Sequence, residues 1–210
     1  MFLEASGVVR DFAPDVPVWH QGDPSEYVFV IRRGCVKVVV ATPVGVHVVL
    51  GIRGPGDIVG ELALVDRRPR RATVLTLGAV TGLMVSGDRF DHLLATRPAV
   101  PLAVARVLSE RLAEADGYRL ALAAFGPAAA LARLVLDLAH RYGQAARDGG
   151  FTLALGLTQK DLADCLGVSS RTVARVVAAW RRVELISFER GSMTIPHPSQ
   201  LQSHAAAVWV

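Results

Sequence analysis

Short β-branched runs separated by turn residues fill the first hundred residues, and this cadence constrains the fold more than any other feature. Runs such as YVFVI and VHVVLGI are followed by glycine, proline or aspartate, and Gly22, Gly34 and Gly56 fall at the turns. Short strands that alternate with turns are typical of antiparallel all-β architectures. The sequence therefore predicts an N-terminal antiparallel β-roll of the jelly-roll type.

A glycine, one carboxylate and a cluster of arginines follow one another between residues 57 and 74. Gly60 can adopt a positive φ and let a ligand approach the backbone, and Glu61 offers two oxygens to a hydroxyl pair such as a ribose edge. The three residues after Glu61 predict one helical turn whose free N–H groups can face an anion. Arg70 or Arg71 can then give a two-pronged contact to phosphate oxygens. This combination favours a small phosphorylated ligand.

From residue 98 to residue 125 the pattern changes to that of one long helix. A stripe of positions recurs every three or four residues: Val104, Leu108, Leu112, Ala115, Arg119 and Leu122. Such a stripe is buried either against the chain's own β-roll or against the same helix of a second chain, about a two-fold axis. The periodicity leaves both arrangements open.

The sequence Phe125-Gly126-Pro127 breaks this helix, because a flexible glycine is followed by a proline of fixed φ. We interpret the break as a hinge between two domains. Beyond it, residues 128–142 predict a helix and residues 151–155 a strand.

The next motif has the spacing of two short helices joined by a tight turn. Thr158 can cap the first helix together with Asp161, Gly167 provides the turn, and Ser169 caps the second helix. The internal core of the motif is predicted to contain Leu162, Leu166, Val168, Val173 and Val176. This pattern predicts a helix-turn-helix, and the residues that follow predict a two-stranded wing that turns at Gly191.

The second helix of such a motif enters the major groove of DNA with its first side chains at the base edges. The exposed candidates for this role are Ser169, Ser170, Arg171, Thr172 and Arg175. Thr158 and Lys160, at the start of the first helix, are further candidates for DNA contact. We expect Lys160, Arg181 and Arg182 to contact phosphates rather than bases.

Cysteine and histidine usage argues against a metal centre. Cys35 and Cys165 are too few for a disulfide framework or an iron–sulfur cluster, and we expect both to be buried thiols. His47 is alone in its strand, whereas a cupin metal site needs two closely spaced histidines and a carboxylate. The other histidines are scattered without ligand spacing: His20, His92, His140, His197 and His204.

Charge and hydropathy indicate a cytoplasmic protein that binds nucleic acid. The formal net charge is +4, and residues 126–210 contribute most of it, with nine basic and six acidic side chains. Basic surface supplies the sequence-independent part of nucleic-acid affinity. No run of 18 apolar residues and no secretory signal is present, so no membrane association is expected.

The segment of residues 57–74, called the cassette below, resembles the phosphate-binding cassette of cyclic-nucleotide-binding domains. The whole chain resembles the CRP/FNR family of bacterial transcription regulators. The residues that carry the first resemblance are Gly60-Glu61-Leu62-Ala63-Leu64, then Arg70 after five intervening residues, then Ala72, Thr73 and Val74. The resemblance implies that Glu61 binds the ribose 2′-hydroxyl and Arg70 the cyclic phosphate. The backbone around Gly60 and Arg71 would complete the pocket, and cAMP is the leading candidate nucleotide. Arg71 stands where relatives carry a small residue.

In the family, the long helix pairs two subunits and its middle reaches into the neighbouring nucleotide pocket. Arg111 matches an arginine of this region, while Ala115 and Asp116 stand at the positions of a Thr-Ser pair that contacts the base. Asp116 could accept a hydrogen bond from an exocyclic amine or repel a phosphate. The resemblance therefore implies a cyclic nucleotide but leaves its base open.

The helix-turn-helix also departs from the family pattern. Arg175 aligns with an arginine that contacts bases, whereas Ser170 and Arg171 replace the family's preceding Arg-Glu pair. An arginine reads the O6 and N7 atoms of guanine with two hydrogen bonds, so these changes alter what the helix can read. We expect a DNA half-site that differs from the TGTGA type.

Together these features predict an α+β chain with three parts. Residues 1–97 would form the nucleotide-binding β-roll, residues 98–125 the dimerisation helix, and residues 126–210 a winged helix-turn-helix. The predicted protein is no enzyme but a homodimer that binds double-stranded DNA under control of a cyclic nucleotide, with RNA polymerase as a further candidate partner. The first alternative is the same architecture with no nucleotide or another ligand, and the second is a cupin-like enzyme. The apolar end, AAAVWV, could pack on its own domain or on the partner.

Overall fold

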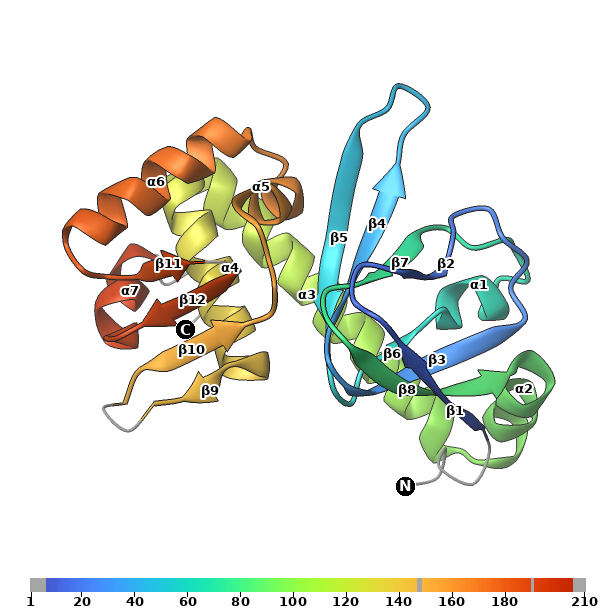
Figure 1. The fold of residues 1–210 in the computed structure, drawn as a ribbon. Coiled ribbons are helices and arrows are strands. Elements are labelled where there is room, and N and C mark those ends of the chain that lie inside the picture. Colours follow the sequence, from blue (N-terminus) through green and yellow to red (C-terminus); the bar gives the residue numbers. More distant parts are fainter. Residues whose placement is uncertain (1–6, 147–148, 190, 206–210) are drawn as a thin grey trace. The chain divides into compact units, whose positions relative to one another are not determined.

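The computed structural model describes residues 7–146, 149–189 and 191–205 of the chain (Figure 1). The chain divides into two compact units, Met1–Ser109 and Glu110–Val210, and the long helix α3 (Ala99–Phe125) contributes to both. In the described ranges, no helix is long and apolar enough to span a membrane. The last five residues of the apolar C-terminal end lie outside the described residues.

The first unit is an antiparallel β-roll built from two four-stranded sheets, which confirms the predicted architecture (Figure 1). One sheet has the order β1-β8-β3-β6 and the other β2-β7-β4-β5. The strands are β1 (Val8–Phe12), β2 (Pro17–Trp19), β3 (Tyr27–Arg33), β4 (Val36–Ala41), β5 (His47–Arg53), β6 (Ile58–Val59), β7 (Thr73–Thr76) and β8 (Val80–Ser86). Helix α1 (Glu61–Val65) lies between β6 and β7, and helix α2 (Gly87–Thr96) follows the last strand, β8.

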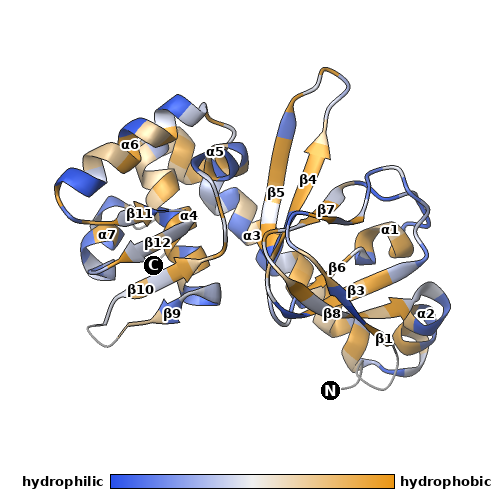
Figure 2. Ribbon diagram, viewed as in Figure 1, coloured by the Kyte–Doolittle hydropathy of each residue, from blue (hydrophilic) through white to orange (hydrophobic). Residues whose placement is uncertain are grey.

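Alternate residues of β3 belong to two separate hydrophobic clusters, because successive side chains of a strand point to opposite faces. Phe29 and Ile31 join the cluster inside the roll, together with Val36, Val59 and Val74. The other face of β3 contributes to a cluster that Phe90 of α2 covers, with Val100, Val104 and Val107 of α3 packed against it. The β-branched content of the strands supplies both layers, and β4 is largely hydrophobic in Figure 2.

Helix α3 buries only part of its surface within one chain. Val104, on the predicted stripe, packs on the outer cluster of the β-roll, and Gly117 and Ala121 are buried in the second unit. Leu112, in the middle of the stripe, is 64% exposed. The first part of the stripe therefore packs on the chain's own β-roll, whereas Leu112 in its middle is exposed in the single chain.

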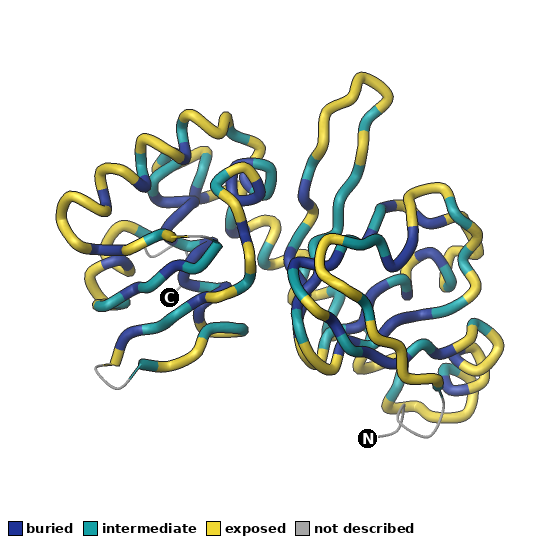
Figure 3. The backbone as a smooth tube through the Cα atoms, in the orientation of Figure 1, coloured by how far each residue is buried: buried dark blue, intermediate teal, exposed yellow. Residues whose placement is uncertain are grey.

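The second unit surrounds the apolar helix α4 (Pro127–Tyr142), nine of whose residues are buried. A small antiparallel sheet of order β11-β12-β10-β9 contacts α4 through β10. The elements are β9 (Gln144–Ala145), β10 (Phe151–Ala154), α5 (Gln159–Leu166), α6 (Ser170–Arg182), β11 (Ser187–Glu189), β12 (Ser192–Ile195) and α7 (Pro198–His204). Figure 3 shows the buried inner residues and the exposed outer face of α6. The predicted helix-turn-helix and wing are confirmed.

Several details differ from the sequence prediction. The elements β1, α2, β9 and α7 were not predicted, and β10 ends at Ala154, one residue earlier than expected. In the helix-turn-helix core, Val176 is only half-buried, while Val177 and Trp180 are buried. A helix face recurs every three to four residues, so Val173, Val177 and Trp180 form one inward stripe that Val176 flanks.

Candidate functional site

The cassette is centred on Gly60, which precedes helix α1 with φ 88° in the left-handed region. A Cβ atom at this position would lie 2.5 Å from Nη1 of Arg70 and 3.1 Å from the ring of Trp19. Both the backbone angle and the close approach therefore require glycine. Glu61, the first residue of α1, is 1% exposed, so its carboxylate is held inside the fold.

Arg70 lies with its guanidinium inside the β-roll and is 3% exposed. Its Nη1 donates to the carbonyl oxygen of Gly60 at 3.2 Å, and its Nη2 donates to the carbonyl oxygen of Tyr27 at 2.6 Å. The guanidinium also stacks 4.0 Å from the ring centroid of Trp19 and 4.8 Å from that of Tyr27. Two backbone carbonyls and two aromatic faces thus fix the orientation of the arginine fork.

The electrostatic setting of Arg70 suits an anionic ligand. Burial lowers the pKa of Arg70, while Tyr27 and the nearby carboxylates of Asp23, Glu26 and Glu61 oppose this shift. An arginine keeps its charge in proteins, so the positive charge stays in a poorly solvated place. Among the described residues, none accepts a hydrogen bond from the buried Nε of Arg70. A ligand oxygen beside the fork would therefore gain a charge-assisted contact.

Two of the predicted ligand residues of the cassette, Arg71 and Leu62, are exposed. Arg71 is half-exposed and forms an ion pair with Asp66, the C-cap residue of α1, and Leu62 is 41% exposed. An open hollow of about 600 Å³ lies beside the cassette, between the Pro24–Glu26 loop, residues 64–69 and the start of α2. Glu61 and Arg70 are not among its lining residues. The ligand site predicted from the cassette is thus distinct from this surface hollow.

The predicted base-contacting residues lie on the part of α3 that belongs to the second unit. Arg111 is half-buried, Ala115 is exposed, and the carboxylate of Asp116 pairs with Arg119 at 3.2 Å on the same helix. The structure brings Gly60, Glu61 and Arg70 together within the first unit. A role of Arg111, Ala115 and Asp116 in the same pocket remains a prediction.

The helix-turn-helix is held by two complete caps. The side chain of Thr158 accepts from the backbone N–H of Asp161 at 3.1 Å, and Asp161 accepts from the backbone N–H of Thr158 at 2.9 Å. Gly167 ends α5 in the left-handed region with φ 64°, and Oγ of Ser169 accepts from the backbone N–H of Thr172 at 3.1 Å. These contacts fix where α6 begins, and therefore which side chains it presents.

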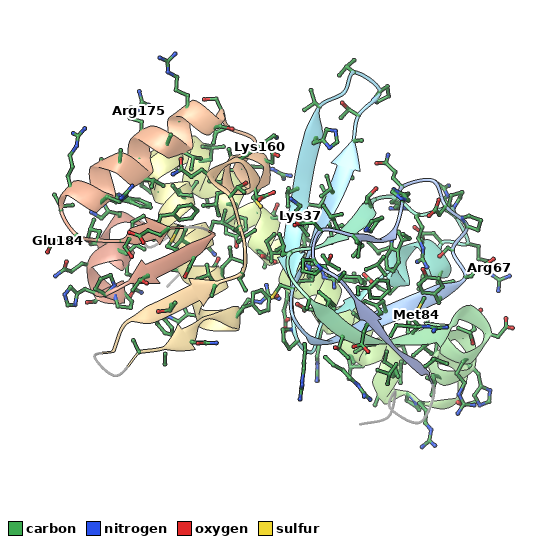
Figure 4. All side chains as sticks on the ribbon, in the orientation of Figure 1. Lys37, Arg67, Met84, Lys160, Arg175 and Glu184 are labelled. Carbon is green, nitrogen blue, oxygen red and sulfur yellow. The ribbon has the colours of Figure 1, made fainter. Side chains whose placement is uncertain are left out.

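Helix α6 presents a polar, basic outer face. Ser170, Arg171 and Arg175 are exposed, and Figure 4 shows the side chain of Arg175 pointing away from α6. The hydroxyls of Ser169 and Thr172 lie 2.8 Å apart and serve the cap. Lys160 on α5 pairs with Asp164 at 2.6 Å. The exposed face has the composition that the DNA-contact prediction requires, with Arg171 and Arg175 in its first two turns and Arg181 and Arg182 in its last turn.

Sequence reasoning missed the aromatic residues that hold Arg70. Trp19 and Tyr27 stand edge to face with ring centroids 5.7 Å apart, and the indole N–H of Trp19 donates to the carbonyl oxygen of Ala72 at 3.0 Å. The only signal was the presence of aromatic side chains in two strands, Trp19 in β2 and both Tyr27 and Phe29 in β3. Nothing in their spacing links them to an arginine more than 40 positions further along the chain, since the tertiary fold makes this contact.

A second unpredicted cluster joins α3 to α4. The hydroxyl of Tyr118 donates to Glu114 at 3.2 Å, and Arg141 pairs with the same carboxylate at 3.3 Å. Burial and the charges of Glu114 and Asp137 raise the pKa of Tyr118 far above its usual value. Burial also raises the pKa of Asp137, although Arg133 opposes this shift. The cluster fixes the hinge-proximal part of α3 on the second unit.

In the described part of the chain, no three or more histidine, cysteine, aspartate or glutamate side chains lie together in a group that could hold a metal ion. Burial and the charge of Asp57 raise the pKa of Cys35 to about 12, so the thiol stays protonated at neutral pH. Cys165 is only half-buried, whereas the sequence predicted a buried thiol.

Comparisons with known proteins match a known domain family to each of the two parts of the chain. Residues 9–97 match the family model of the cyclic nucleotide-binding domain, and residues 129–204 match the Crp-like helix-turn-helix domain. The chain belongs to the CRP/FNR family of transcription regulators, whose characterised members among its relatives are regulators rather than enzymes.

Two relatives and one solved structure show what this chain is similar to. The chain is 29% identical over 195 residues to the CRP-like cAMP-activated global transcriptional regulator of Mycobacterium tuberculosis. The aligned region covers 93% of this chain and 87% of the relative. It is 24% identical over 196 residues to the global nitrogen regulator of Nostoc, covering 92% and 87%. The solved structure of FixK2 from Bradyrhizobium japonicum shares the fold, with a TM-score of 0.82, 18% identity, and 97% and 99% of the two chains covered.

Proposed function

We propose that this chain is a homodimeric transcription regulator whose DNA affinity is controlled by a cyclic nucleotide. The observation that carries the proposal is the buried guanidinium of Arg70, which donates to the carbonyl oxygen of Gly60. Glu61, the residue after Gly60, is buried as well. The same chain carries a capped helix-turn-helix with exposed Arg171 and Arg175. A phosphate sensor and a DNA reader on one chain support a ligand-controlled regulator.

In the proposed complex, Arg70 binds the cyclic phosphate and Glu61 the ribose 2′-hydroxyl. The backbone around Gly60 and Arg71 completes this half of the pocket, and Arg111, Ala115 and Asp116 are assigned to the base. The mycobacterial relative is described as cAMP-activated, which makes cAMP the first nucleotide to test. The nitrogen regulator relative supports the second candidate, the same architecture controlled by another signal.

For the DNA complex, we assign Ser169, Ser170, Arg171, Thr172 and Arg175 to the bases and neighbouring phosphates, and Thr158 and Lys160 to the backbone. The exposed Leu112 of α3 supports pairing of two such helices, because an isolated apolar stripe is normally covered. Ligand binding would shift the population toward the DNA-competent state through residues 111–127. In this region Gly126 has a positive φ of 83°, which a hinge glycine tolerates.

The test uses the full chain and a DNA site selected from a random-sequence pool. DNA affinity is measured while cAMP and cGMP are titrated into wild-type protein, Arg70→Ala and the control Arg68→Ala, which changes an exposed arginine of the cassette loop. We expect at least one nucleotide to raise the DNA affinity of the wild type and of Arg68→Ala, and none to affect Arg70→Ala. If no nucleotide binds and Arg70→Ala leaves DNA affinity unchanged, the nucleotide-control proposal is wrong and the second candidate stands.

A further inference from the structure

The boundary between the two compact units lies inside α3, between Ser109 and Glu110, and not at the predicted break at Gly126. Gly126 does separate α3 from α4, since its φ is 83° and no atom lies within 4 Å of a Cβ added there. A glycine in such open space leaves the backbone free to turn. Side-chain contacts between α3 and α4 must therefore hold residues 110–125 on the second unit.

One of these contacts brings Arg133 of α4 against the backbone of α3 at Gly117. A Cβ atom on Gly117 would lie 2.6 Å from Nη2 and 2.8 Å from Nε of Arg133. Gly117 is buried, and so is Ala121, one turn further along α3. Glycine inside a helix lowers helix stability relative to alanine. The close approach of the arginine explains why this position of α3 has no side chain.

A second contact lies one turn of α3 before the first. Nη1 of Arg141 pairs with Oε2 of Glu114 at 3.3 Å, and the hydroxyl of Tyr118 donates to the same carboxylate at 3.2 Å. The Glu114 side chain is 15% exposed, so water screens this ion pair only in part. On α4, Nε of Arg133 lies 3.8 Å from Oδ2 of Asp137. The three α4 residues are spaced four apart and therefore share one helix face, which is turned toward α3.

Helix α4 connects these contacts to the DNA-reading helix. Nine residues of α4 are buried, and α4 contacts both α5 and α6 of the helix-turn-helix. A helix packed in this way moves together with its neighbours. The contacts that hold α4 on α3 therefore also hold α6, with Arg171 and Arg175, in one orientation relative to α3.

We propose that Gly117, Arg133, Glu114 and Arg141 are positioning residues that lock α4 to α3 across the flexible Gly126, and so hold α6 in the orientation from which it binds a specific DNA site. These residues act through α4 and are not among the proposed DNA contacts. The inference rests on the DNA binding of the proposed function and is independent of nucleotide control. A preorganised recognition helix loses less conformational freedom on binding than a loosely attached one.

The experiment measures the affinity of the full chain for the selected DNA site and for random DNA, under the conditions of the selection. Arg141→Met and Glu114→Gln break the same ion pair with opposite changes in net charge, so an effect common to both is not attraction of charge to DNA. Gly117→Ala displaces the guanidinium of Arg133 while it raises the helix propensity of α3. The control, Arg106→Met, removes an exposed arginine from the part of α3 that belongs to the first unit.

We expect the ratio of selected-site affinity to random-DNA affinity to fall about 2- to 30-fold in all three lock variants. Arg106→Met should leave this ratio unchanged. Hydrogen exchange at the backbone amides of residues 117–130 should become faster in the lock variants, because the contacts that restrain the junction are lost. Exchange in α5 and α6 should stay at the wild-type rate, which shows that the helix-turn-helix itself is intact.

The outcomes separate this inference from the proposed function. An unchanged or increased ratio in Arg141→Met and Glu114→Gln refutes the lock and leaves DNA binding and nucleotide control standing. Weaker binding of Arg141→Met and tighter binding of Glu114→Gln to both DNAs also refutes it, because net charge alone then explains the effects. Should an ion-pair variant fail to fold, the ratio in Gly117→Ala decides the question on the same criterion. Absence of specific DNA binding by the wild type overturns both proposals.

Discussion

The guanidinium of Arg70 lies 4.0 Å from the ring centroid of Trp19, although the two residues come from different segments of the β-roll. The indole keeps this place through a hydrogen bond from its Nε1 to the carbonyl oxygen of Ala72. A cation over an aromatic face is stabilised more strongly when both are desolvated. Trp19 therefore belongs both to the inner core and to the site.

Replacing Trp19 should weaken both stability and ligand binding. We expect Trp19→Ala to lower the free energy of unfolding by about 3–5 kcal/mol, because a buried indole is lost and a cavity remains. Trp19→Phe should lose less, since it keeps an aromatic face for Arg70. Urea unfolding of both variants provides the measurement, and equal losses in the two would show that the aromatic contact contributes nothing.

Gly60→Ala should be more damaging than a glycine substitution at an uncrowded turn. Its positive φ disfavours any side chain by about 1 kcal/mol, and its Cβ would also displace Arg70. The matched control is Gly56→Ala, where φ is 91° and no atom lies within 4 Å of the added Cβ. We expect the control to lose only the stability that the φ angle costs, and Gly60→Ala to lose more stability together with nucleotide affinity. Similar effects of the two variants on unfolding and binding would contradict the proposed crowding.

The exposed arginines of α6 should separate into base contacts and phosphate contacts. We expect Arg175→Ala to weaken binding to the selected site by about 1–3 kcal/mol and to relax specificity at one position. Arg181→Ala should weaken binding to all DNA alike and reduce the salt slope by about 1. Binding isotherms on selected and random DNA at several salt concentrations measure both effects. If Arg175→Ala weakens both DNAs equally, Arg175 contacts phosphate.

Asp137 should make the stability of the protein depend on pH. Burial raises its folded-state pKa above 3.8, against the opposing effects of Arg133, Tyr118 and His140, while Glu114 adds to the shift. The folded state then holds the proton more tightly than the unfolded state, so stability falls as pH rises from about 4 through the folded-state pKa. We expect Asp137→Asn to remove this decline, which urea unfolding across the pH range measures. Parallel pH profiles of variant and wild type would refute the shift.

Two buried arginines of the β-roll, Arg70 and Arg53, show how far sequence reasoning reaches. Arg70 was identifiable because the cassette is contiguous: Gly60, Glu61 and the arginine keep a fixed local spacing. Arg53 carried no such signal, since its inward position depends on the register between β5 and β4. The caps at Thr158 and Ser169 were predicted correctly for the same reason as the cassette, because each cap joins residues three positions apart.

The sequence alone determined the β-roll, the long helix, the helix-turn-helix and the cassette, because turn residues, helical periodicity, capping and motif spacing all act over short chain distances. Only the tertiary structure decided that Trp19 and Tyr27 hold Arg70, that Arg53 faces the same interior, and that Glu114 and Tyr118 meet α4. Those contacts join residues distant in sequence, and strand pairing and core packing select their partners from many side chains of the same chemical type.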